Sequence, residues 1–175
     1  KGERIKCVHL FTFKSSKKNY RYRYIIEAEV FDIEFIAIKF YQKNHKISKK
    51  KYQTLTNANE VRNIVNSCLQ VIPILLQIYP NHSFGAVGSR AISEDEKFES
   101  EKKNQRFVIY RAIMLKKFKE DKRFAFVESE DNSAFAIINL SKLVRIEDLE
   151  FYVVDKYNEI LDCMVEIYNE IHYPE

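Results

Sequence analysis

Glycine, proline and tryptophan are scarce in this chain of 175 residues, which has three Gly, three Pro and no Trp. The shortage of Gly and Pro argues against long flexible linkers. A hydrophobic content of 46% is typical of a folded protein and not of a disordered one. Because this length supports one sizeable core and is short for two, we expect a single globular domain over residues 1–175.

Cysteine and histidine are also few, and their spacing excludes the common metal sites. Cys7, Cys68 and Cys163 form no CxxC pair, and the four histidines show neither HxH nor HxxxH spacing. Each cysteine lies within an apolar pattern, so we predict three reduced, small core residues. We expect no metal and no cofactor.

Long apolar runs are absent. A helix needs roughly 20 apolar residues to cross a bilayer, and the longest candidate, Ser67–Tyr79, is interrupted by Gln70, Pro73 and Gln77. The opening residues, KGERIKC, do not have the apolar region of a signal peptide. We therefore expect a soluble, cytoplasmic protein without membrane contact.

The apolar periodicity predicts the element order β-β-β-α-β-α-β-β-α. Ile5–Phe13 is a candidate strand, residues 20–30 alternate as a half-buried strand, and Ile33–Tyr41 is apolar on both faces and therefore central. Strands and helices do not alternate strictly. The pattern predicts an α+β fold, with a mainly antiparallel sheet and the helices packed on one face.

Capping and breaking residues indicate where the helices begin and end. Asn57 with Glu60 forms a capping box at the start of the first helix, and Pro73 should kink or end that helix. The later elements are a strand at Ser83–Ser89, a helix carrying Phe107 and Phe118, a hairpin over residues 123–139 and a helix over residues 149–172.

The charge is unevenly distributed along the chain. The last 31 residues carry −7, which leaves +11 for residues 1–144 of a chain with a formal charge of +4. The C-terminal acidic helix either shields the basic surface of its own domain or is presented to a partner. The apolar stripe of this helix either packs on its own domain or forms a homodimer or protein interface. The stripe consists of Val154, Tyr157, Leu161, Met164, Tyr168 and Ile171.

Basic residues interleaved with tyrosine suggest nucleic-acid binding, because cations contact phosphates while rings stack on bases. The alternative is a solvated loop beside a sheet face whose tyrosines belong to the core. The candidate nucleic-acid-binding residues are Arg21, Arg23, Lys43, Lys49, Lys50 and Lys51.

Two of the three glycines, Gly85 and Gly88, lie in one short strand, which suggests close backbone approach, a bulge or a positive φ. Arginines follow them, so an anion site for phosphate is one interpretation and a strand packed tightly under a helix is the other. The candidate anion-binding residues are Gly88, Ser89, Arg90, Arg106 and Arg111.

No catalytic constellation stands out, and we assign no catalytic residue. The strongest enzymatic alternative is a metal-independent ribonuclease that uses His82 as base, Arg90 and Arg106 as phosphate clamps and Tyr110 as an assisting group.

The stretch from YPN through SFGAVGSR to QRFVIYRAI resembles a group of short uncharacterised bacterial proteins. The matching residues are Gly88, Ser89, Arg90, Arg106 and Tyr110. The resemblance covers residues 20–140 and is carried by a motif of low information content. These are domains of unknown function, some of them associated with mobile elements, defence or toxin–antitoxin neighbourhoods. The resemblance implies a bacterial cytoplasmic setting and no particular reaction, and the acidic C-terminal helix lies outside it.

These observations lead to three hypotheses. The first is a non-enzymatic binding or regulatory domain that acts through protein–protein assembly. The second is a nucleic-acid-binding protein, and the third is an RNA-directed toxin or nuclease.

Overall fold

The computed structural model describes residues 5–15, 22–54, 61–89 and 104–173. The predicted α+β class and element order are confirmed within these ranges. The strands are β1 (Ile5–Lys14), β2 (Arg23–Phe31), β3 (Phe35–Gln42), β4 (Ser83–Val87), β5 (Phe124–Ser129) and β6 (Ala134–Asn139). The helices are α1 (Val61–Ile78), α2 (Gln105–Phe118) and α3 (Leu149–His172), with 3₁₀ turns at Lys43–His45 and Ile146–Asp148.

The described strands form one sheet in the order β1-β2-β3-β4-β6-β5. All neighbouring strands are antiparallel except β3 and β4, which are parallel. A parallel pair needs a long crossover connection, which α1 supplies between β3 and β4. The prediction of a mainly antiparallel sheet is therefore confirmed.

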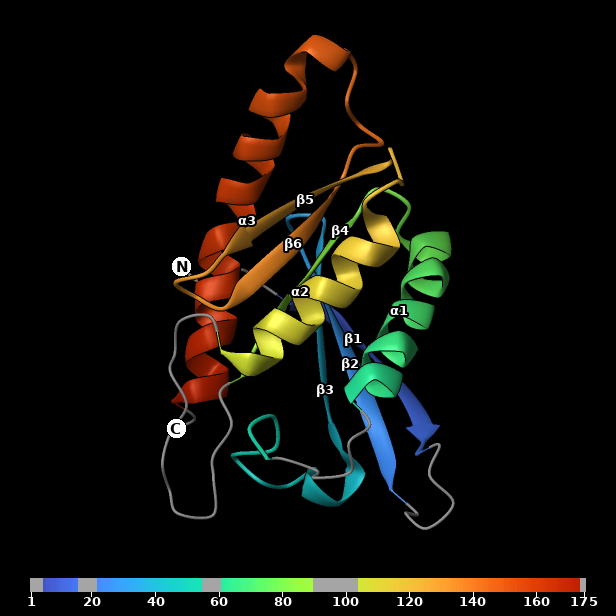
Figure 1. The fold of residues 1–175 in the computed structure, drawn as a ribbon, viewed down its shortest axis with the longest axis vertical. Helices are drawn as coiled ribbons and strands as arrows, with labels where there is room; N and C mark the ends of the chain where they lie inside the picture. The colour runs from blue at the N-terminus through green and yellow to red at the C-terminus, as the bar shows by residue number, and fades with distance from the viewer. Residues whose placement is uncertain (1–4, 16–21, 55–60, 90–103, 174–175) are drawn as a thin grey trace.

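The helices cover both faces of the sheet (Figure 1). On one face α1 and α2 form a core with alternate residues of the strands, such as Val30 and Ile36. On the other face α3 packs against the intervening residues, such as Phe35 and Ala37. The prediction that the helices lie on one face is therefore wrong for α3. A central strand such as β3, apolar on both sides, needs apolar cover on both sides.

The strand predicted within residues 20–30 is observed as β2, but the prediction that it is half-buried is wrong. Within β2, residues of both faces are buried, including the acidic Glu29. The glutamates on the α3 side are covered because tyrosine and lysine side chains bond to them, as described below. Alternation of polar and apolar residues therefore marks two chemically different faces here, and both of them are covered.

Helix α1 continues through Pro73 to Ile78, so it does not end at the proline. Leu69, Ile72 and Leu75 are buried on either side of it, while Pro73 itself faces solvent. The predicted capping box at Asn57 lies outside the described residues.

Among the described residues, α1 is the one helix long and apolar enough to cross a membrane, with a mean hydropathy of 1.3. The core helix of a soluble protein meets the same criterion, and α1 packs one side on the sheet. The finding is consistent with a soluble protein.

The two glycines of the β4 region allow close packing. A Cβ on Gly85 would lie 2.8 Å from the Phe35 ring, and one on Gly88 would lie 2.7 Å from the backbone nitrogen of Phe107. Neither glycine has a positive φ. Of the alternatives drawn from the sequence, close backbone approach is the one confirmed.

We expect Gly88→Ala to lower the free energy of unfolding by about 1–3 kcal/mol, because the added methyl group overlaps the first turn of α2. Urea denaturation measures this change. Gln70→Ala, at an exposed position of α1, is the matched control and should leave the midpoint nearly unchanged. An equal midpoint for the two variants would contradict the close-packing explanation.

Candidate functional site

A cavity opens where the two parallel strands separate. β3 and β4 pair only from Phe35–Ser83 to Ala37–Gly85, after which β3 runs on to Gln42 without β4 beside it. The cavity therefore lies at the carboxyl ends of the parallel pair. In open sheets with parallel strands, ligands bind outside these ends.

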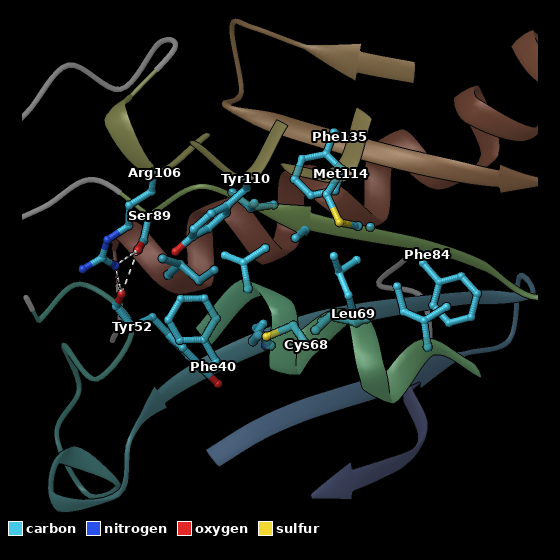
Figure 2. Close-up of a pocket in the computed structure, with 18 residues that line it drawn as sticks. Phe40, Tyr52, Cys68, Leu69, Phe84, Ser89, Arg106, Tyr110, Met114 and Phe135 are labelled. Atoms are coloured by element: carbon cyan, nitrogen blue, oxygen red, sulfur yellow. Dashed lines mark hydrogen bonds between the residues drawn. The ribbon is translucent and has the colours of Figure 1, made fainter. Parts of the chain in front are cut away.

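The cavity has a volume of about 60 Å³. One water needs roughly 10–15 Å³ of such space, so the cavity is larger than a single water site. Most of its wall is apolar (Figure 2). The wall residues include Cys68 and Leu69 of α1, Tyr110 and Met114 of α2, and Phe84 and Phe135 of the sheet.

One end of the cavity is polar, where Arg106, Ser89 and Tyr52 meet (Figure 2). Nη1 of Arg106 donates to the Tyr52 carbonyl and the Ser89 hydroxyl. Nη2 donates to the carbonyls of Gln53 at 3.3 Å and Thr54 at 3.2 Å. The Ser89 hydroxyl also donates to the Tyr52 carbonyl at 2.7 Å. Arg106 therefore fixes residues 52–54 against the end of β4.

The hydroxyl of Tyr110 lies at the cavity wall. The residue is only 6% exposed, and its ring packs edge-on against Phe40 at 5.8 Å between centroids. Its side chain points into the space between α2 and α1 (Figure 2), and no described residue hydrogen-bonds its hydroxyl. Burial raises the pKa of Tyr110, so the hydroxyl stays protonated and can both donate and accept.

Lys39 also lines the cavity and connects it to α3. Its ammonium bonds Glu29 of β2 at 2.7 Å and Glu170 of α3 at 3.0 Å, and its side chain is 3% exposed. Burial raises the pKa of Glu29, although the charge of Lys39 opposes that rise. One oxygen of Glu29 is buried and meets no donor among the described residues.

Glu27 gathers a second polar cluster beside the first. It accepts hydrogen bonds from Tyr52 and, at 2.8 Å, from Tyr41, and Lys51 lies 3.4 Å away. Burial alone would raise the pKa of Glu27, but these hydrogen bonds and the lysine charge lower it below its ordinary value. Because Tyr52 belongs to the cavity wall, its hydrogen bond to Glu27 holds one residue of that wall in place.

The predicted anion-binding residues are only partly brought together. Ser89 and Arg106 meet, but the N–H of Gly88 donates to the Ser133 carbonyl at 2.7 Å. Arg111 instead forms a two-point ion pair with Glu128. Arg90 lies outside the described residues, so the anion site stays a prediction.

The predicted nucleic-acid-binding residues lie near one end of the sheet. The pairing of Tyr24 with Gln42 brings the start of β2 beside the end of β3. Lys51 forms an ion pair with Glu27 and lies over the rings of Tyr41 and Tyr52. Arg21 lies outside the described residues. The exposed members of the set are Arg23, Lys43, Lys49 and Lys50.

The predicted interface stripe on α3 divides into two parts. Met164, Tyr168 and Ile171 are buried on the sheet, whereas Val154 is exposed. Between them, Tyr157 and Leu161 are half-buried. Packing on the protein's own sheet is therefore observed for the C-terminal part of the stripe.

His82 does not join Arg106. It precedes β4, whereas Ser89 follows it, so about 20 Å of extended chain separates them. Burial lowers the pKa of His82, and its ring packs on Tyr79. Among the described residues no group of three His, Cys, Asp or Glu side chains is placed to hold a metal ion.

Sequence reasoning missed the cavity and the role of Lys39. The signal for Lys39 was present, because it is a lone charged residue in the apolar run Phe35–Tyr41. A charge in such a strand needs a buried partner. The cavity had no comparable signal, since its walls come from seven separate segments of the chain.

We expect Lys39→Met to lower the free energy of unfolding by about 3–5 kcal/mol, because it leaves the carboxylate of Glu29 buried without a partner. The double variant Lys39→Met/Glu29→Leu removes both charges and should recover most of that loss. Chemical denaturation of both variants measures the difference. Equal stability of the single and double variants would contradict the buried-pair explanation.

Comparison of the chain with known protein families, characterised proteins and solved structures finds no match. The resemblance of residues 20–140 to uncharacterised bacterial proteins therefore stays a prediction.

Proposed function

We propose that this protein is a non-enzymatic binding domain for a small, mostly apolar molecule that carries one hydrogen-bonding group. The ligand lies in the cavity between the sheet, α1 and α2. The observation that carries the proposal is the mostly apolar cavity with the Tyr110 side chain, 6% exposed, in its wall. A ligand group that hydrogen-bonds the Tyr110 hydroxyl contributes about 0.5–1.5 kcal/mol.

The chemistry of the wall defines the ligand class. Apolar surface buried on binding contributes about 25 cal/mol per Å², so a hydrocarbon body is favoured. The two cations of the cavity, Lys39 and Arg106, already bond protein acceptors. A neutral ligand with a hydroxyl or carbonyl group therefore fits better than an anion.

The titratable groups of the wall support binding over catalysis. Burial raises the pKa of the Cys68 thiol to about 12, which keeps it protonated at neutral pH. Tyr52 and Tyr110 likewise have raised pKa values, mainly because of burial. General acid–base catalysis works best with a group that titrates near the operating pH. The raised pKa values keep Cys68, Tyr52 and Tyr110 from titrating near neutral pH.

The position of the cavity suggests how occupancy acts on the rest of the protein. Ile171 of α3 contributes to the wall, and the carbonyl of Ile171 accepts a 2.7 Å hydrogen bond from Gln53. Lys39 joins the wall to Glu170. Ligand binding therefore changes the contacts that hold the end of α3, which gives the domain a regulatory output.

Phenol is a suitable probe, with toluene as its hydroxyl-free isostere. We expect phenol to raise the Tm of the wild-type protein and to bind Tyr110→Phe about fivefold more weakly, since one hydrogen bond is worth about 1 kcal/mol. Toluene should bind both proteins equally. Calorimetric titration and thermal unfolding measure these affinities.

Two results would contradict the proposal. One is the absence of any phenol or toluene effect on the Tm of the wild-type protein. The other is equal phenol affinity of the wild-type protein and Tyr110→Phe.

A second candidate function is protein–protein assembly through the start of α3. The first turns of α3 extend beyond the sheet (Figure 1), and Phe151 is 77% exposed. Val144, Ile146 and Val154 are exposed nearby. Single exposed apolar residues are ordinary, but a group of this kind marks interaction sites. This group favours a homodimer formed through the start of α3.

For this second candidate we expect a dimer in light scattering that Phe151→Ser converts to a monomer with an unchanged circular dichroism spectrum. A wild-type monomer at all concentrations would exclude the homodimer. Measuring the ratio of absorbance at 260 and 280 nm on the same sample tests the nucleic-acid alternative.

The cytoplasmic location expected from the sequence stays a prediction.

A further inference from the structure

A cluster of three reactive side chains lies at the β1 edge of the sheet and shares no residue with the cavity wall. Cys7 and His9 are two residues apart on β1 and therefore point to the same face. Tyr79 follows the end of α1 and reaches both of them. The Cys7 sulfur lies 3.2 Å from the Tyr79 hydroxyl and 3.6 Å from Nε2 of His9, and that nitrogen lies 2.9 Å from the hydroxyl.

The cluster corrects the prediction that all three cysteines are core residues. Cys68 and Cys163 are buried, but Cys7 is only partly buried. Cys163 has no exposed surface, and burial raises the pKa of Cys68 to about 12. Cys7 is therefore the most exposed of the described cysteines, and it has a base beside it.

The three groups meet the requirements of an activated thiol. A cysteine nucleophile needs a base that takes its proton and a donor that stabilises the thiolate. With Nε2 unprotonated, His9 accepts the thiol proton, directly or through the Tyr79 hydroxyl. The Tyr79 hydroxyl then donates to the sulfur. The hydrogen bond to Cys7 raises the pKa of Tyr79, so this donor keeps its proton in neutral solution.

We propose that Cys7 is a thiol-modification site that exchanges with low-molecular-weight disulfides, with His9 as its base and Tyr79 as the donor to sulfur. The Cys7 sulfur forms a bond with one sulfur of the disulfide R–S–S–R, and the original S–S bond breaks. The second sulfur leaves as a thiolate and takes the proton that His9 received from Cys7. The products are a mixed disulfide on Cys7 and one free thiol, RSH.

The test uses 5,5′-dithiobis(2-nitrobenzoate), a symmetric disulfide whose released thiolate absorbs visible light. We expect one fast-reacting cysteine per folded chain, placed on Cys7 by peptide mass spectrometry. Cys7→Ser should abolish the fast phase. His9→Gln and Tyr79→Phe should each slow it about tenfold or more at pH 7, since a positioned base contributes about 10²-fold or more.

A second pH separates chemistry from structure. At pH 10, above the ordinary thiol pKa of about 8.5, the thiol no longer needs a base. The rates of His9→Gln and wild type should therefore converge. A variant in which Cys68 and Cys163 still do not react with the disulfide reagent is folded. If His9→Gln exposes these two cysteines to the reagent, His9→Asn replaces it.

Several outcomes would overturn the proposal. They are a fast phase that maps to another cysteine, a Cys7 rate no higher in the folded chain than in urea, or an unchanged rate for His9→Gln at pH 7. A rate loss that persists at pH 10 would assign His9 a structural role only. None of these outcomes depends on ligand binding in the cavity.

Discussion

The short parallel pairing between β3 and β4 is the constraint on which the rest of the structure depends. It spans Phe35–Ala37 and Ser83–Gly85 and joins the β1-β2-β3 half of the sheet to the β4-β6-β5 half. So few ladder bonds hold two halves together only with help from the helices, which pack across both faces. The same shortness creates the cavity, because the strands separate where the pairing stops. Gly85 lets the Phe35 ring approach at that point.

The acidic C-terminal helix changes along its length in how far it packs on the sheet. Toward its end, Glu170 neutralises the buried Lys39, and Ile167 and Ile171 pack on the sheet, so this part covers its own domain. At its start, Phe151 and Val154 face solvent. One helix thus has a part that packs on the sheet and a part whose apolar side chains are exposed. Lys156, which donates to the Ile33 carbonyl at 2.9 Å, marks the boundary between them.

Local pattern predicted most elements, because periodicity is a property of neighbouring residues. The final helix over residues 149–172 agrees with α3 as observed. Which faces of the sheet are covered by helices could not be predicted in this way, since that depends on the face against which α3 packs. Glu27 and Glu29, which alternate with apolar residues, predict a solvated face. In the fold, Tyr41 and Tyr52 bond Glu27, and Lys39 pairs with Glu29.

The site shows the same limit. Arg106 and Arg111 are equivalent in the sequence pattern, yet one bonds residues 52–54 and the other Glu128. Their partners lie far apart in the chain, so spacing alone could not separate them. Tyr110 was named from the motif, but its importance comes from the empty space beside its hydroxyl, and no linear pattern encodes that space.

The fork of Arg106 has a consequence for the backbone beside the cavity. Residues 52–54 belong to no helix or strand, and buried carbonyls without donors are costly. The guanidinium satisfies three consecutive carbonyls there, those of Tyr52, Gln53 and Thr54. A single side chain thus satisfies backbone acceptors that a neighbouring strand would satisfy within a sheet. Lysine would keep the charge but not the planar fork, so this role belongs to arginine in particular.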